Sequence, residues 1–559
     1  MKLLIVESPA KAKTISKYLD GKYTVKASVG HIRDLPKSNK KAIDIENGFI
    51  PHYEISPGKE KIVSELKSLS QKAEEVLLAT DPDREGEAIA WHIKEATGLK
   101  NPKRVVFHEI TKEAVQEAIT HPRNIDDNLR KAQEARRVLD RLVGYDLSGL
   151  IWKKVRYGLS AGRVQSPALR IIMEREREIR AFKSEKFWNI TADVLNASKT
   201  PFTLVCVEEP RDKKEVDRIV KISNQEAWTV IDLNETEAKR TPRSPFITST
   251  LQQSASTRLG MSPSRTMGIA QKLYEDGLIT YMRTDSTILS SYAQNQIAGI
   301  IDKKYGKGLY VPHVFSKKSK NAQEAHEAIR PTHFSDEDAG HTPEQKALYA
   351  LIWQRTVASQ MADAKILRTK MTANVTSKNI PDFVINGSRV LFPGWLLADP
   401  NARGEDVELP KVTVGEKLIL KEIKTEEKET QPPARYSEAG LIKELEKRGI
   451  GRPSTYASII KTLEERGYVN KLNKALHPTD TGDVVSSFLE QNFGNYISDT
   501  FTAEMEDKLD TIATGEIDYE KTLRDFYTPF IKDVKSKEKM EKVTNLGEAE
   551  SSIHCPKCE

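Results

Sequence analysis

The sequence predicts a multidomain protein in which an N-terminal α/β domain precedes separate helical and β domains. Three observations support this fold class. The chain has 559 residues, too many for one hydrophobic core, so three to five domains are expected. Its first domain alternates strand and helix signals. Two later blocks of short strands flank a long helical stretch.

The N-terminal domain is expected to span residues 1–125. Ser8 after the first apolar run is a helix N-cap, Pro9 takes the first helical position, and Thr111 opens a later helix. This alternation predicts a parallel sheet with ligands bound at the carboxyl ends of its strands. Strands are expected at residues 2–7, 74–80 and 104–110.

Residues 186–240 and 365–430 have the pattern of short alternating strands, whereas residues 241–364 are mostly helical. One β domain is therefore expected to be interrupted by a helical domain and then resumed.

A second discontinuous domain is expected from the basic helical segment 126–185 together with residues 430–530. Within it, two amphipathic helices around a Gly/Pro loop at 437–470 predict a helix-turn-helix unit. Residues 531–559 have the composition of a linker.

Composition excludes several classes of protein. Hydrophobic residues make up 38% and charged residues 30%, so most of the chain should be folded and soluble. The apolar run at the N-terminus is too short for a signal peptide or a membrane span, so a cytoplasmic protein without a membrane partner is expected. Cys206, Cys555 and Cys558 cannot form a disulfide framework.

The formal net charge is only +6, but its distribution is informative. Residues 147–173 and 238–274 contain no Asp or Glu, and they supply the cations and hydroxyl groups that a phosphate backbone requires. Either stretch alone fits a solvated basic face equally well. The second runs into GLITYMRTDS, residues 277–286, which favours a functional surface.

Asp81, Asp83 and Glu85 follow a predicted strand at alternate positions. In an extended segment three such carboxylates would converge and need a cation, which predicts a magnesium site. A calcium loop is rejected because His92 stands where its last glutamate should be. Acids enriched in a first helical turn would explain Glu85 but not Asp81. No P-loop motif occurs in the sequence.

Eight motifs in order connect these residues to a known family. They are VESPAKAKTI, SVGHIRDLP, ATDPDREGEAIAWH, FHEIT, GLSAGRVQSPALR, GLITYMRTDS, QEAHEAIRPT and GIGRPSTYASII. With them the chain resembles the type IA DNA topoisomerases over essentially its whole length, and TYMRTDS and AHEAIRPT are more similar to the topoisomerase I branch than to topoisomerase III. The resemblance implies a Toprim fold for the first domain and a toroid, including an arch-like β domain, whose hole can hold DNA.

The resemblance also implies residue roles. Tyr281 would form a 5′-phosphotyrosine bond with one DNA strand, and Arg283 would contact the scissile phosphate. Glu7 and Lys11 would lie beside the leaving 3′-oxygen. Mg²⁺ would be held by Asp81, Asp83, Glu85 and Glu7. The DNA would be bound by Arg163, His326, Arg156, Gln165, Ser166 and Arg452.

The chemistry of these residues agrees with such roles. A tyrosine hydroxyl, with a pKa of ~10, is a poor nucleophile until nearby cations or a base assist it. Arg283 lies two residues from Tyr281, on the same face of an extended segment, and can stabilise charge on the phosphoryl group. Lys11 can donate a proton to the departing oxygen. Exchange of one phosphodiester for another needs no ATP.

Taken without the family, each residue has a plainer interpretation. Tyr281 could be a half-buried strand residue, and His326 a surface residue of a helix. Arg163 could belong to an ordinary loop, and Glu7 could be a helix N-terminal acid.

The expected function is ATP-independent, Mg²⁺-dependent relaxation of negatively supercoiled DNA, acting on its single-stranded segments, by a monomer associated with the nucleoid. The alternatives are a topoisomerase III-like decatenase, a Toprim nuclease or primase, and a non-catalytic DNA-binding protein. The C-terminal HCPKC offers one C-x-x-C pair where a zinc ribbon needs four ligands, so no stable zinc is expected, and the chain is either truncated there or lacks the ribbon. RNA polymerase, which relatives contact through that tail, is therefore an unsupported partner.

Overall fold

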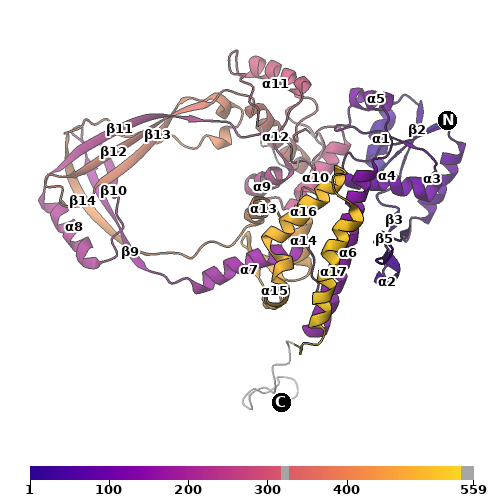
Figure 1. The fold of residues 1–559 in the computed structure, drawn as a ribbon. Coiled ribbons are helices and arrows are strands. Elements are labelled where there is room, and N and C mark those ends of the chain that lie inside the picture. The colour runs from indigo at the N-terminus through magenta and orange to yellow at the C-terminus, as the bar shows by residue number, and fades with distance from the viewer. Residues whose placement is uncertain (316–326, 543–559) are drawn as a thin grey trace.

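The computed structural model describes residues 1–315 and 327–542, which form a ring (Figure 1). A β-barrel lies on one side of the ring and the N-terminal α/β domain with a helical body lies on the other. The expected combination of an α/β domain with helical and β domains is confirmed. Within the described ranges, no helix is long and apolar enough to cross a membrane.

The N-terminal domain contains a four-stranded parallel sheet in the order β2-β1-β7-β8. The sheet buries both faces, because Leu3, Ile5 and Leu78 pack in one core while Leu4 and Val6 pack in another. Its strands are β1 (Lys2–Val6), β2 (Tyr23–Ala27), β7 (Glu75–Leu78) and β8 (Lys103–Arg104). Its helices are α1 (Pro9–Tyr18), α2 (Asn39–Ala42), α3 (Glu60–Lys72), α4 (Arg84–Thr97) and α5 (Lys112–Thr120). Two small ladders pair β3 (Arg33–Asp34) with β6 (Glu54–Ile55) and β4 (Ile43–Asp44) with β5 (Ile50–Pro51).

The helix caps expected in this domain are present, since the side chains of Ser8 and Thr111 accept hydrogen bonds from the first turns of α1 and α5. The strand expected at residues 104–110 is wrong beyond Arg104. Val105, Phe107 and Ile110 instead bury their side chains in the core shared with the helical domain. This apolar run therefore packs against that domain and does not extend the strand ladder.

The β-barrel is closed and has the strand order β10-β13-β12-β11-β14-β9. Its two blocks of strands are separated in sequence by a helical domain. One end of the long strands leads into that helical domain, and the other end leads into the helical body (Figure 1). The strands are β9 (Lys186–Leu195), β10 (Pro201–Cys206), β11 (Trp228–Arg240), β12 (Ala364–Val375), β13 (Phe383–Phe392) and β14 (Lys417–Glu429), with α8 (Lys213–Gln225) packed against them. Between the blocks lie α9 (Thr248–Leu259), α10 (Pro263–Glu275), α11 (Ser291–Lys304) and α12 (Pro343–Ala358), and the 3-10 turns η1 (Gly394–Leu397) and η2 (Pro400–Ala402) precede β14.

The helical body combines two segments that are distant in sequence and share one hydrophobic core. Helices α13 and α14 form the expected pair around a Gly/Pro loop. The linker expected from residue 531 is wrong at its start, because Phe530 and Val534 are buried and α17 continues to Lys537. The elements are α6 (Asp127–Lys154), α7 (Gln165–Ala181), α13 (Glu438–Lys447), α14 (Tyr456–Glu465), β15 (Val469–Leu472), β16 (Ala475–Pro478), α15 (Asp480–Phe493), η3 (Gly494–Ile497), α16 (Asp499–Ala513) and α17 (Tyr519–Lys537).

Candidate active site

The acidic motif lies where the parallel sheet ends and α4 begins. The expectation that Asp81, Asp83 and Glu85 share one extended segment is wrong. Strand β7 ends at Leu78, Asp83 is the N-cap of α4 and accepts a hydrogen bond from Gly86 N at 2.9 Å, and Glu85 belongs to the first helical turn. Asp83 therefore has a structural role as the N-cap of α4. Contacts with other parts of the chain orient the three carboxylates.

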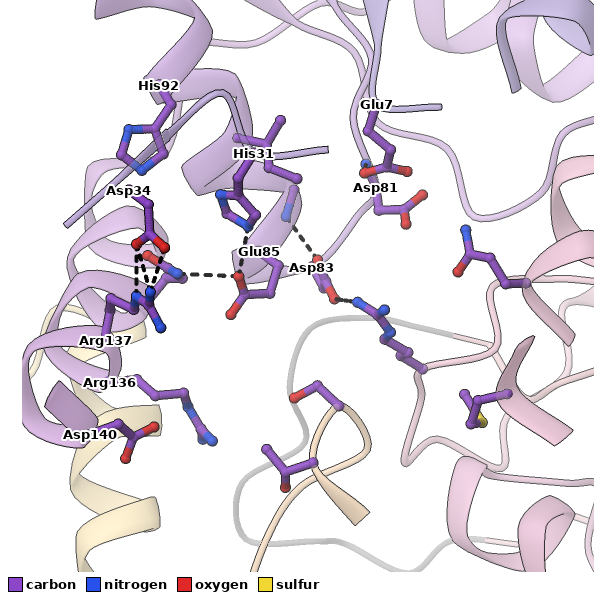
Figure 2. A pocket seen from close by; sticks show the side chains of 18 of the residues that line it. Glu7, His31, Asp34, Asp81, Asp83, Glu85, His92, Arg136, Arg137 and Asp140 are labelled. Atoms are coloured by element: carbon purple, nitrogen blue, oxygen red, sulfur yellow. Dashed lines mark hydrogen bonds and ion pairs between the residues drawn. The ribbon is translucent and has the colours of Figure 1, made fainter. Parts of the chain in front are cut away.

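A cavity of about 790 Å³ brings these acids together with residues from several distant parts of the chain. Asp83 lies between Glu85 on one side and the pair Glu7 and Asp81 on the other (Figure 2). The wall also includes His31, Arg33, Asp34, Gln133, Arg136, Arg137, Asp140, Met267, Gln271, Met282, Arg283, Ser454 and Thr455.

Lys11 is fully buried between two carboxylates. Its Nζ donates to Asp81 Oδ1 at 2.9 Å and to Glu7 Oε1 at 3.3 Å. Burial and the negative charge of Asp81 raise the pKa of Glu7 to about 8, so Glu7 carries a proton at neutral pH. Burial opposes ionisation of Asp81, but Lys11 and the Glu7 proton hold its pKa below the usual value. Lys11 and Glu7 can therefore supply protons to an oxygen that binds beside them.

Glu85 faces the opposite side of the cavity. Its Oε2 lies 3.3 Å from His31 Nε2 and accepts from Gln133 Nε2 at 3.2 Å. Burial opposes its charge, but the hydrogen bond and charge of His31, with Arg136 and Arg283 nearby, lower the pKa of Glu85 to about 2. Sequence reasoning did not identify His31 or Gln133, although His31 belongs to the SVGHIRDLP motif.

Tyr281 and Arg283 both contact the central acid. The Tyr281 hydroxyl donates to Asp83 Oδ2 at 2.6 Å, and Arg283 Nη1 lies 3.6 Å from the same oxygen. Tyr281 is only 1% exposed, and its ring packs edge-on against Tyr274 with centroids 5.3 Å apart. Burial and the charge of Asp83 raise the pKa of Tyr281 well above its ordinary value, with Arg283 opposing them.

The segment that carries Tyr281 is not a strand of a sheet but is docked on the N-terminal domain. Tyr281 N donates to His108 O at 2.8 Å, and Arg330 Nη2 pairs with Glu109 Oε2 at 2.9 Å. Gly277, with φ +77°, lets the segment approach Ile110, whose carbonyl oxygen would lie 2.4 Å from an added Cβ. The FHEIT motif thus serves as the docking site of the tyrosine segment, a role that sequence reasoning missed.

The residues expected to bind DNA lie in different environments. Arg163 is buried, its Nε donates to Asp140 at 2.9 Å and its Nη1 pairs with Glu506; Arg452 pairs with Asp510 at 2.9 Å. The outcomes for the other four are as follows: Ser166 is buried and accepts from Gly162 N, Gln165 is half-buried, Arg156 is exposed, and His326 lies outside the described residues. Their roles toward DNA remain predictions.

Carboxylate oxygens are the ligands that Mg²⁺ prefers, and Mg²⁺ is usually held by one or two of them together with water and substrate phosphate. Glu7, Asp81, Asp83 and Glu85 line one cavity and offer this donor set. Among the described residues, however, no three such side chains converge as a preformed metal site. The donor chemistry fits Mg²⁺, provided that substrate phosphate and water complete the coordination.

Comparison with known proteins identifies the family. Residues 2–110 match the Toprim domain model, and residues 124–524 match the DNA topoisomerase model. The chain belongs to the type IA DNA topoisomerase family.

Individual relatives agree with this assignment. The chain is 44% identical to DNA topoisomerase 1 of Vibrio cholerae, across 100% of this chain and 69% of the relative. It is 42% identical to DNA topoisomerase 1 of Escherichia coli, across 100% of this chain and 69% of the relative. The structure of full-length topoisomerase I from Thermotoga maritima matches with a TM-score of 0.85 at 41% identity, covering 95% of this chain and 90% of that chain. The toroidal fold and the family assigned from the motifs are thereby confirmed.

Gly86 is a structural requirement of the acidic motif that sequence reasoning missed. A Cβ at this position would lie 2.0 Å from Asp81 O. Gly86→Ala should therefore displace the Asp81 backbone, cost about 1–3 kcal/mol of unfolding free energy, and reduce activity in proportion to that displacement. Thermal unfolding and plasmid relaxation measure both effects. Gly299→Ala, in α11 with nothing within 4 Å of the added Cβ, is the matched control; it should leave activity unchanged and should not lower stability, because Ala is the better helix former. Normal activity and stability of Gly86→Ala would contradict the close packing of Gly86 against Asp81.

Proposed function

We propose that this enzyme relaxes negatively supercoiled DNA without ATP, by cleaving one strand, passing the other strand through the break and resealing it. The observation that carries this proposal is the 2.6 Å hydrogen bond between the Tyr281 hydroxyl and Asp83 of the acidic motif. A tyrosine buried against a Toprim carboxylate, with an arginine beside it, suits phosphoryl transfer to tyrosine. A nuclease or primase that used only the acids would give this tyrosine no role.

In the proposed cleavage step the Tyr281 hydroxyl oxygen attacks the scissile phosphorus, and its proton passes to Asp83, which already accepts its hydrogen bond. The bond from phosphorus to the 3′-oxygen breaks, leaving a 5′-phosphotyrosine linkage and a 3′-hydroxyl. Lys11, held between Glu7 and Asp81, gives the departing oxygen its proton. Arg283 stabilises charge on the phosphoryl oxygens. Resealing follows the same path in reverse.

Asp81, Asp83 and Glu85, together with Glu7 once it has lost its proton, are proposed as the ligands of Mg²⁺ in the DNA complex. When bound, the ion neutralises phosphate charge and orients the phosphate. To bind the ion, Asp83 has to release the Tyr281 hydroxyl or share its oxygens between the hydroxyl and the ion. The closed structure thus couples the position of the nucleophile to one carboxylate of the proposed ion site.

Entry of DNA requires a change in this closed structure, because Tyr281 is buried and the cavity wall includes Met282 and Arg283 but not Tyr281. We propose that residues 1–125 separate from residues 241–364 at the contact between FHEIT and the tyrosine segment. The barrel, residues 186–240 and 365–430, would act as the arch that carries residues 241–364 away from the body. Residues 126–185 and 430–530 would remain with the N-terminal domain, since Arg84 pairs with Asp510 at 2.6 Å.

On the body, Arg156, Gln165 and Ser166 are proposed to bind one DNA strand together with Arg163 and Arg452. Since Arg163 and Arg452 share the carboxylates of α16, they would add phosphate contacts with their remaining N–H groups. One of these, Arg163 Nη2, is buried without a hydrogen-bond partner among the described residues. An unpaired buried donor next to a proposed strand path favours an anionic ligand.

The function is tested with negatively supercoiled plasmid, Mg²⁺ and no nucleotide. The expected products are topoisomers that differ by single linking-number steps, and positively supercoiled plasmid without single-stranded regions should react poorly. Nicked circles that accumulate without topoisomers would favour the nuclease alternative. Unlinking of single-stranded catenanes in preference to relaxation would favour a topoisomerase III-like role, which the relatives named DNA topoisomerase 1 do not favour.

Replacement of Asp83 by asparagine tests the central carboxylate. Asparagine also caps helices, so α4 should form, but the variant loses the proton acceptor and one proposed ion ligand. We expect cleavage to fall by about 10²- to 10⁴-fold and the Mg²⁺ dependence of the remaining activity to change. Asp126→Asn, at the N-cap of α6, is the matched control and should retain full activity. An unchanged rate and unchanged Mg²⁺ dependence for Asp83→Asn would rule out both roles.

A further inference from the structure

Three arginines meet where the barrel joins the helical domain, and we name Arg243, Arg258 and Arg355 the junction arginines. Arg243 lies in the connection from β11 to α9, and Arg258 lies in the last turn of α9. Arg355 lies in the last turn of α12, just before the connection to β12. Both connections join the helical domain to the long strands of the barrel (Figure 1). None of the three lines the cavity that contains the acidic motif, so the cluster is separate from the candidate active site.

Arg355 is buried without a carboxylate partner. It is only 6% exposed, and its guanidinium carbon lies 4.3 Å from the centroid of the Phe246 ring. Its Nη1 and Nη2 lie 3.5 Å from Ser244 O and Ser254 Oγ, which is longer than an ordinary N–H···O hydrogen bond. Within the described part of the chain it forms no ion pair. A buried guanidinium held by a ring and two long hydrogen bonds keeps most of its charge uncompensated.

The same contacts place the other two cations beside Arg355. Ser244, whose carbonyl Arg355 approaches, directly follows Arg243 in the chain. Ser254 lies one helical turn before Arg258, on the same face of α9. Burial, and after it the charges of Arg243 and Arg258, lower the pKa of Arg355 to about 10. The three guanidinium groups are therefore close enough to repel one another.

The carboxylate that faces this cluster is already engaged. Asp399 is 2% exposed, and its Oδ1 and Oδ2 accept from Arg258 Nη1 and Nη2 at 2.8 and 2.9 Å. Arg243 is exposed and, within the described ranges, has no hydrogen bond or ion pair through its side chain. One buried cation and one exposed cation are thus left beside each other without an acid. Arginine pairs of this kind suit the oxygens of a phosphate group, which the planar guanidinium binds through two N–H groups.

We propose that the junction arginines bind a phosphate group at the point where the barrel joins the helical domain. Arg355 forms the floor of the site, Arg243 forms its exposed rim, and Arg258 adds positive charge while it holds Asp399. A phosphate bound there bridges the two connections that carry Arg243 and Arg355, and so fixes the barrel relative to the helical domain.

Two sources can supply this phosphate. Helix α9 borders the opening of the ring (Figure 1), so one source is the backbone of a DNA strand that lies in the ring. The other source is free phosphate or pyrophosphate in solution. The first source rests on the proposed function, because it requires DNA within the ring, whereas the site itself does not.

The first arm of the test uses inorganic pyrophosphate without DNA and without Mg²⁺, so that the acids of the cavity repel it. Titration calorimetry should show binding to the wild type. Arg243→Gln should bind about 5- to 30-fold more weakly, as loss of an exposed charge-assisted hydrogen bond predicts, and Arg355→Met more weakly still. Because Arg243 is exposed, its variant should fold even if Arg355→Met does not. Arg218→Gln, an exposed arginine of α8 at the far side of the barrel (Figure 1), is the matched control and should bind like the wild type.

The second arm measures binding of a long single strand of DNA at several salt concentrations. If a DNA phosphate fills the site, Arg243→Gln should bind DNA more weakly, and the slope of log affinity against log salt should fall by about 0.7, the value of one phosphate contact. If free phosphate alone fills it, the variant should lose pyrophosphate binding and keep the affinity and slope of the wild type for DNA. Wild-type binding of both pyrophosphate and DNA by Arg243→Gln would overturn the site. Failure of the proposed function is distinguishable, because it would appear as cleavage that persists in Tyr281→Phe whatever the junction variants do.

Discussion

Tyr281→Phe should form no covalent adduct with DNA and should relax plasmid at least about four orders of magnitude more slowly than the wild type. The substitution removes only the hydroxyl that donates to Asp83, so the buried ring and its contact with Tyr274 remain. Loss of that hydrogen bond should cost about 1 kcal/mol of stability, too little to unfold the protein. The measurement is plasmid relaxation with SDS trapping of adducts.

Two controls make this result specific. Tyr292→Phe, on the exposed surface of α11, should relax plasmid and form adducts like the wild type. Tyr281→Phe itself should still bind single-stranded DNA with near wild-type affinity, because the proposed phosphate contacts are made by other residues. Adducts or topoisomers produced by Tyr281→Phe would show that another residue is the nucleophile.

Lys11→Met is expected to have the second largest effect. The variant loses the proposed proton donor to the 3′-oxygen, which should slow cleavage by about 10²- to 10⁴-fold. It also leaves Glu7 and Asp81 buried without their cation, which should lower the free energy of unfolding by about 3–5 kcal/mol. Quenched cleavage assays measure the cleavage rate, and chemical denaturation measures the free energy of unfolding. Lys13→Met, on the exposed side of α1, should change neither.

A substrate with sulfur in place of the leaving 3′-oxygen separates chemistry from folding. A thiolate leaves without prior protonation, since its pKa is far below that of an alcohol. Lys11→Met should therefore recover most of its cleavage rate on this substrate, whereas a misfolded variant would remain inactive. Equal impairment on both substrates would remove Lys11 from proton transfer and leave it a structural residue.

Local patterns in the sequence predicted much of the fold. Ser8 and Pro9 define the start of α1 because capping and proline geometry act within one turn of chain. The order of strand and helix signals indicated the parallel sheet, and two separated strand blocks indicated an interrupted β domain. The apolar residues after Arg104 were misassigned, because the decision between a ladder and a core contact depends on the distant helical domain.

In the candidate site, too, local sequence predicted some features while others depend on distant segments. Asp83 and Tyr281 could be chosen from motifs, and the structure places their side chains in contact. The means by which the carboxylates are held could not be foreseen, because each has partners from distant segments: Lys11 for Asp81, and His31 with Gln133 for Glu85. The need for Gly86 likewise depends on the distance between a helix and the loop before it, which no local pattern encodes.

The central claim is that Tyr281 becomes covalently joined to DNA. The most direct measurement traps the adduct formed by the wild-type enzyme on a single-stranded oligonucleotide, digests protein and DNA, and identifies the modified residue by mass spectrometry. The expected result is a nucleotide attached through its 5′-phosphate to Tyr281 and to no other residue. A nucleotide attached to a different side chain, or one attached through its 3′-phosphate, would contradict the account.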